Sequence, residues 1–134
     1  MIFIDQEDLI MEYQFNEYMQ GYIANLKASE MWFHSAHHVA KGPGFVADHK
    51  DLYTKIYNQL GDHFDLLIEK SIALSGFEDV ACPVRLSLAT SRILKKRYTS
   101  PVNLSSEHIV ALSIECIANL INSISSLYSK YKKH

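Results

Sequence analysis

From Ser106 to Tyr131 the chain contains neither glycine nor proline, and its apolar residues recur at every third or fourth position. That spacing places them on one side of an α-helix and excludes a half-buried strand, in which apolar and polar residues would alternate. At 1.5 Å per residue such a helix is roughly 40 Å long. A chain that contains it has to build its core from long helices.

The composition supports this fold class. Only five glycines and three prolines occur in 134 residues, too few for an all-β sandwich, which needs a turn about every 8 to 12 residues. Hydrophobic residues at 48% and charged residues at 21% exclude the disordered and low-complexity classes. At roughly 100 to 200 residues per domain, residues 1–134 are predicted to form a single all-α domain.

We predict three long helices and one short one, at about residues 5–38, 45–74, 83–97 and 106–131. Asp5 and Ser105 are suited to cap the first and last helices. Lys41–Gly44 breaks the chain after the first helix, and Gly76 ends the second. No internal repeat or linker interrupts this order.

The last predicted helix carries two apolar stripes. The first comprises Ile109, Leu112, Cys116, Leu120, Ile124 and Leu127, and the second comprises Ile114, Ile117, Ile121 and Tyr128. An apolar face this wide needs neighbours on more than one side. We therefore predict a homodimer or higher homo-oligomer formed through the second and last helices.

Charge is divided unevenly along the chain. Residues 1–83 hold five lysines against thirteen acidic residues, whereas residues 84–134 hold eight Lys and Arg against two Glu. The division favours association of opposite faces or an anionic partner, and an ordinary folded dipole explains it as well. Nucleic acid is the weakest partner prediction, since only Arg92–Arg97 and the lysines at 130, 132 and 133 could contact phosphate.

Cys82 and Cys116 are too few for a disulfide scaffold and are expected to be reduced. The residues after Met1 lack the basic region and apolar run of a signal peptide, and no 18-residue apolar stretch is present. We therefore expect a cytoplasmic protein without a membrane partner.

Histidines and carboxylates supply the only candidate chemistry, because phosphate-binding loops and hydrolase motifs are absent. Five of the seven His lie at positions 34, 37, 38, 49 and 63. Glu30, His34 and His37 share one side of the first helix, and the second helix offers Asp62, Asp65 and Glu69. Mixed imidazole and carboxylate groups suit iron, manganese or zinc, although a helical His is more often structural.

Two segments carry a more specific pattern. In residues 33–49, His37 and His49 are twelve residues apart with Lys41-Gly42 between them, and in residues 62–76 Asp65 and Glu69 precede Lys70. The pattern resembles the Dps family of ferritin-like proteins. The resemblance implies a ferritin-like helical bundle. It also implies an iron site across a dimer interface, with the two His from one subunit and the Asp and Glu from its partner.

The resemblance further implies ferroxidase activity, in which peroxide or oxygen oxidises ferrous iron bound by His37, His49, Asp65 and Glu69. His34, Asp62 and His63 are expected to support these ligands or to substitute for them, and we predict no catalytic residue beyond the ligands. In some family members a cage stores the iron and coats DNA. Here the acidic start of the chain replaces the lysine-rich arm used for DNA binding.

The chain departs from the family pattern in several places. The step from His49 to Asp65 is one residue longer, which turns a helix by about 100°, so a π-bulge, with Gly61 as the candidate position, would have to absorb it. His38 replaces the usual Trp, and Tyr53 replaces a further acidic residue.

The family's fourth long helix, which helps line the cage pores, has no counterpart, and this disfavours a cage. Another subunit's last helix could fill the groove left open. The alternative function is a non-catalytic helical interaction or assembly module that has lost the iron site.

Overall fold

The computed structural model describes the backbone of residues 6–132 and the side chains of residues 17–130 and 132. Within this part the fold is all-α, as predicted. Its helices are α1 (Gln6–Val39), α2 (Thr54–Ser75), α3 (Pro83–Arg97) and α4 (Ser106–Lys132). A π-helix at Ala47–Tyr53 leads directly into α2, and a 3₁₀ turn at Glu78–Ala81 precedes α3.

Local sequence signals set most helix ends. Gly76 takes the left-handed conformation (φ 76°) that ends α2, and Pro83 occupies the first turn of α3. The Ser105 hydroxyl accepts a hydrogen bond from the backbone N–H of His108 at 3.2 Å, which confirms it as the cap of α4. The cap predicted at Asp5 lies outside the described residues.

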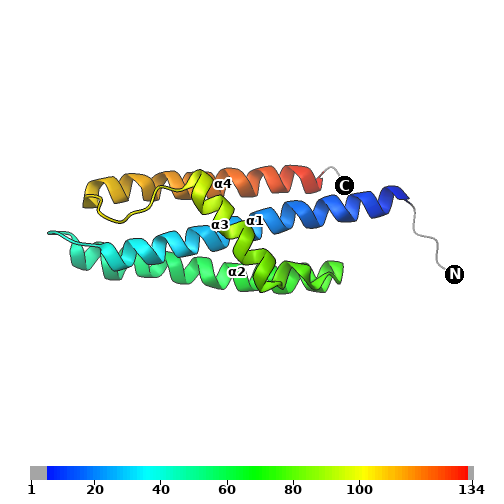
Figure 1. The fold of residues 1–134 in the computed structure, drawn as a ribbon, viewed down its shortest axis with the longest axis horizontal. Helices are drawn as coiled ribbons and strands as arrows, with labels where there is room; N and C mark the ends of the chain where they lie inside the picture. Colours follow the sequence, from blue (N-terminus) through cyan, green and yellow to red (C-terminus); the bar gives the residue numbers. More distant parts are fainter. Residues whose placement is uncertain (1–5, 133–134) are drawn as a thin grey trace.

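The three long helices lie side by side, with α2 and α4 on either side of α1, and α3 crosses α1 diagonally (Figure 1). Each of the other helices packs against α1, whereas α2, α3 and α4 make no close backbone approach to one another. The residues of α1 at these contacts include the fully buried small side chains of Ala24, Ala28, Ser29 and Ala36. Small side chains allow neighbouring helices to approach α1 closely.

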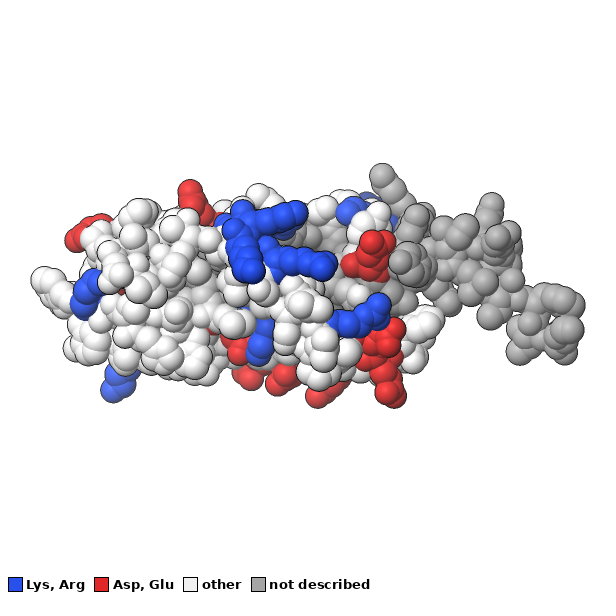
Figure 2. Space-filling model, in the orientation of Figure 1, with Lys and Arg blue, Asp and Glu red and all other residues white. Residues whose placement is uncertain are grey.

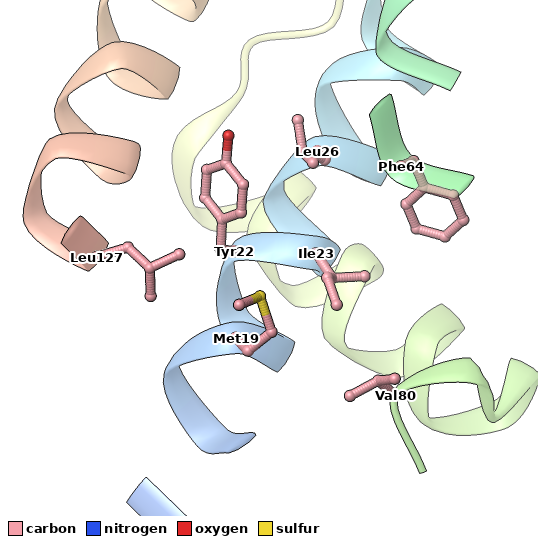
Figure 3. Close-up of a cluster of buried hydrophobic side chains, with 7 residues drawn as sticks. All are labelled: Met19, Tyr22, Ile23, Leu26, Phe64, Val80 and Leu127. Carbon is pink, nitrogen blue, oxygen red and sulfur yellow. The ribbon is translucent and has the colours of Figure 1, made fainter. Parts of the chain in front are cut away.

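Two apolar clusters lie along α1 between Met19 and Ala36. In the first, Met19, Tyr22, Ile23 and Leu26 of α1 meet Phe64, Val80 and Leu127, which come from three different segments (Figure 3). The second joins Trp32, Phe33 and Ala36 to Tyr53, Ile109 and Cys116. Because α1 contributes to both, its buried face is the common core of the fold.

The two stripes of α4 have different surroundings. Ile109, Cys116 and Leu127 of the first stripe are buried against α1. The second stripe remains exposed on the single chain, with relative exposures of 65% at Ile114 and 58% at Ile121. The structure thus buries much of the first stripe against α1 and leaves Ile124 exposed together with the second stripe.

A buried polar network joins α1 to the segment between α3 and α4. The Tyr98 hydroxyl lies 2.6 Å from Ser29 Oγ and donates to Asn25 Oδ1 at 3.1 Å. Asn25 also donates to Ser123 Oγ on α4 at 3.2 Å. Burial raises the pKa of Tyr98, so the hydroxyl stays protonated at neutral pH and this network can hold the helices in register.

Tyr98→Phe should lower the free energy of unfolding by about 1–2 kcal/mol, because the buried Ser29 and Asn25 lose a hydrogen-bond partner. Urea denaturation followed by circular dichroism measures the change. Tyr128→Phe is the matched control, since Tyr128 is 66% exposed, and it should change stability by less than about 0.5 kcal/mol. Equal effects of the two substitutions would contradict a structural role for the network.

Candidate metal centre

His37 and His49 lie face to face where α1 ends and the π-helix begins. Their ring centroids are 3.7 Å apart with an interplanar angle of 22°. His37 Nδ1 lies 2.9 Å from the backbone carbonyl oxygen of His49, and His49 Nδ1 lies 2.7 Å from that of His37. The twelve-residue spacing therefore does bring the two imidazoles together.

These reciprocal hydrogen bonds fix the tautomer of each ring. A carbonyl oxygen can only accept, so Nδ1 of each imidazole must carry the proton and donate it. In a neutral imidazole the other nitrogen, Nε2, then keeps its lone pair. Metal-binding histidines are commonly oriented in this way, by donation from the second ring nitrogen to a main-chain carbonyl.

Thr54 is the residue that the sequence reasoning missed. Its hydroxyl donates to the His49 carbonyl at 2.7 Å, and its oxygen lies 3.0 Å from His37 Nδ1. Thr54 follows His49 by five residues, which is the hydrogen-bond spacing of a π-helix. A single threonine in a helical pattern gives no signal of such a contact, so only the tertiary structure could reveal it.

The π-helix bears directly on the extra residue between His49 and Asp65. A π-helix holds more residues per turn than an α-helix and absorbs a one-residue insertion. The sequence pointed to Gly61 as the place for such a bulge, and the structure has it at Ala47–Tyr53 instead. Gly61 lies within regular α2. A Cβ there would come within 3.3 Å of Glu30 Oε1, so glycine permits this side chain to approach.

The other histidines of the junction surround the pair. The His34 ring stacks on Tyr57 at a centroid distance of 4.3 Å and lies 4.5 Å from the His38 ring. The Phe45 ring stacks on His49 at 4.8 Å. The exposed His38 thus joins the imidazole cluster at the position where the resembled family has Trp.

A second group of predicted residues lines a hollow of about 380 Å³ between α1 and α2. Glu30 and His34 of α1 lie on one side, and Asp62 and Asp65 of α2 lie on the other. Lys27 forms an ion pair with Glu30 at 3.2 Å. The hollow therefore presents two exposed carboxylates next to the histidine cluster.

The predicted ligands do not form one site within a single chain. In the part of the chain that the structure describes, no three His, Cys, Asp or Glu side chains are placed to hold a metal ion. Glu69 is exposed on α2, and His63 lines a different hollow, between α2 and α4. Both remain predictions as ligands.

Tyr53 has a structural reason for replacing an acidic residue. Its side chain is 1% exposed and belongs to the cluster around Phe33 and Ile109. A carboxylate at this position would lie in an apolar environment without a paired charge, which is costly. The departure from the family pattern at this position therefore follows from the core of this chain.

The uneven charge of the sequence is visible on the surface. Lys and Arg gather over α3, and acidic side chains line the lower edge, where α2 lies (Figure 2). Arg97 and Lys130 also line a hollow of about 700 Å³ between α1, α3 and α4. The two basic segments that could contact phosphate thus meet at one hollow.

Among the described helices, α4 is long and apolar enough to cross a membrane, judged by length and composition alone. The segment is Ser106–Lys130, and 17% of its apolar window is buried within the fold. The core helix of a soluble protein passes the same test. The prediction that the protein has no membrane partner stays a prediction.

Comparison of the chain with protein families, with characterised proteins and with solved structures finds no match. The resemblance to the Dps family therefore depends on the residues of the two segments quoted above. The structural features that bear on this resemblance are the closeness of the His37 and His49 rings and the π-helix before α2.

His34 should titrate below the usual histidine pKa of 6.5. Desolvation lowers the pKa of His34, and repulsion from His38 and His37 lowers it further, while Glu30 opposes the shift. Because the unfolded chain binds this proton more readily, the contribution of His34 to stability is present above pH 6.5 and is lost as pH falls below it.

An NMR titration of the His34 ring protons measures this midpoint, and His38→Asn should raise it by removing one repulsive charge. The rise should be partial, because desolvation remains. A midpoint at or above 6.5 in the unmodified chain would contradict the expected direction.

Proposed function

We propose that this chain is a Dps-like, ferritin-type protein that binds ferrous iron at a site shared by two subunits and oxidises it. The observation that carries the proposal is the His37–His49 pair, in which both Nδ1 atoms are engaged by main-chain carbonyls and both Nε2 atoms are left to accept a metal. Such imidazoles are suited to iron, with open positions for an oxidant.

The carboxylates support a site between chains. Asp65 and Glu69 are four residues apart on α2, so they lie on the same face of that helix, and both are exposed. In the proposal they complete the site around a metal held by the histidines of a second chain, and Glu69 is the candidate to bridge two ions. Carboxylates also stabilise the ferric product, since they bring negative charge to it.

His34, Asp62 and His63 enter the proposal in different ways. His34 and Asp62 share the hollow next to the histidine pair, and they can support the metal ligands or substitute for them. His63 lines the separate groove between α2 and α4, so its proposed role as a ligand has weaker support.

The second candidate is an assembly module that keeps the fold without iron chemistry. It is favoured by one observation, the exposed apolar stripe of α4. Nucleic acid binding ranks third and is supported by the meeting of Arg97 and Lys130 in one hollow. These candidates predict no ferrous oxidation.

Anaerobic addition of ferrous iron followed by peroxide or air tests the proposal, with the ferric product read by its absorbance. The double variant His37→Ala, His49→Ala should lose at least about tenfold in the oxidation rate, because the imidazole ligands are gone. His108→Ala is the control, at an exposed histidine outside the proposed ligands, and should oxidise iron normally. No protein-dependent oxidation in the unmodified chain would reject the proposal in favour of the assembly module.

Mixing two inactive variants tests whether the site is shared. A chain lacking His37 and His49 should complement a chain lacking Asp65 and Glu69, because a mixed dimer contains one intact site. Random exchange makes half of the dimers mixed, so about a quarter of the sites should recover. No recovery after subunit exchange would place all the ligands within one chain.

Thr54→Val should weaken ferrous binding by about 10- to 100-fold, because outer hydrogen bonds orient metal-binding histidines. Valine keeps the shape of threonine but removes the hydroxyl that contacts His37 and His49. Titration calorimetry under anaerobic conditions measures the affinity. Restored binding in Thr54→Ser would assign the effect to the hydroxyl, whereas unchanged binding in Thr54→Val would contradict the positioning role.

A further inference from the structure

An apolar groove runs between α2 and α4. The backbones of the two helices do not approach each other closely, and α1 forms the floor between them. The groove has a volume of about 330 Å³ and is lined by His63 of α2, by Ile117, Ile121 and Ile124 of α4, and by Tyr22 and Leu26 of α1. The groove therefore lies where a fourth long helix could pack alongside the other three.

The α4 wall of the groove continues into an exposed apolar surface. Relative exposures are 40% at Ile117, 58% at Ile121, 43% at Ile124 and 66% at Tyr128. From Cys116 to Ser129 the helix contains no charged residue. A contiguous apolar surface of this kind on a folded chain marks an interaction site, and a helix exposed only to water would carry charges on that side.

We propose that the occupant of this groove is α4 of a second copy of the chain, so that two α4 helices pack antiparallel around a two-fold axis near Ile121. The isoleucines of α4 that line the groove also form the exposed apolar surface of that helix. A two-fold axis brings such a surface into contact with the same surface of a second copy. Each α4 would fill the other chain's groove. The pairing does not depend on bound iron, because His37, His49, Asp65 and Glu69 lie outside the groove.

Helix direction supports the antiparallel arrangement. The helices α2 and α4 run in the same direction along the fold (Figure 1). A two-fold axis perpendicular to α4 reverses the second copy, so the entering helix runs opposite to both walls. Antiparallel neighbours bring opposite ends of the helix dipoles together, which favours this packing over a parallel one.

Charge at the groove's end agrees with this register. If Ile121 lies on the axis, Lys132 of the second copy lies at the level of Val110, seven residues before Ile117. Val110 lies three residues after Glu107, which is in the first turn of α4, and Lys130 and Lys132 lie in its last turn. The basic last turn of one copy thus lies next to the acidic first turn of the other.

A lipid bilayer is the competing occupant of the apolar stripe. However, Ile109, Cys116 and Leu127 of α4 are buried against α1. Crossing a membrane would require α4 to leave this core, whereas docking of a second copy requires no change in the fold. The structure therefore favours the second copy.

Sedimentation equilibrium in EDTA tests the proposal, since the chelator removes any association that depends on metal. The unmodified chain should have twice the 15.3 kDa mass of one chain. Ile121→Glu should weaken the dimer by about a hundredfold or more, because it buries charge at the axis without a partner. Leu74→Glu is the matched control, at a position 83% exposed and outside the groove, and should leave the mass unchanged.

Cysteine cross-linking tests the geometry without disrupting the fold, in a Cys82→Ser background. Ile121→Cys should cross-link to itself, and tagged Ile117→Cys should cross-link to untagged Ile124→Cys more rapidly than to itself. Preferred self-cross-linking of Ile117→Cys would overturn the antiparallel arrangement. A monomeric chain in EDTA, whether or not it binds phosphatidylcholine vesicles, or a dimer that survives Ile121→Glu, would overturn the proposal.

Discussion

The buried face of α1 is the interaction on which the rest of the structure depends. The helices α2, α3 and α4 all pack against it and make no close backbone approach to one another. Four small buried residues of α1 allow neighbouring helices to approach it closely. Large residues at positions 19, 22, 23, 26, 32 and 33 then fill the spaces between them. The fold therefore depends on packing against this face.

The same arrangement creates both proposed sites. The end of α1 brings His37 against the π-helix that carries His49. Because α2 and α4 lie on either side of α1, they leave a groove with α1 as its floor. A chain organised around one central helix thus presents a paired-imidazole site near the turn after α1 and an apolar surface along its open side. In our proposals the imidazole site and the apolar surface each bind a second chain, and they lie on different parts of the molecule.

The π-helix could be expected from the sequence, but its position could not. Counting residues from His49 to Asp65 revealed one extra residue and required a bulge, and the structure contains a π-helix. Its position could not be inferred from Gly61, because that glycine serves the close approach of Glu30. The role of Thr54 could not be predicted for a similar reason, because its contact with His37 joins residues that are distant in the chain. The positions of His34, Asp62 and Asp65 around one hollow likewise depend on how α1 and α2 pack.

The sequence by itself determined the helices, because apolar spacing, glycine, proline and capping residues act within a few positions of one another. It also determined that α4 has two apolar stripes, since the period of a helix assigns each residue to a side. Only the tertiary structure decided which stripe is buried, because that depends on which neighbours α1 brings to α4. It also decided that the two histidines donate their Nδ1 protons to each other's carbonyls, a contact that requires the end of α1 and the start of the π-helix to lie side by side.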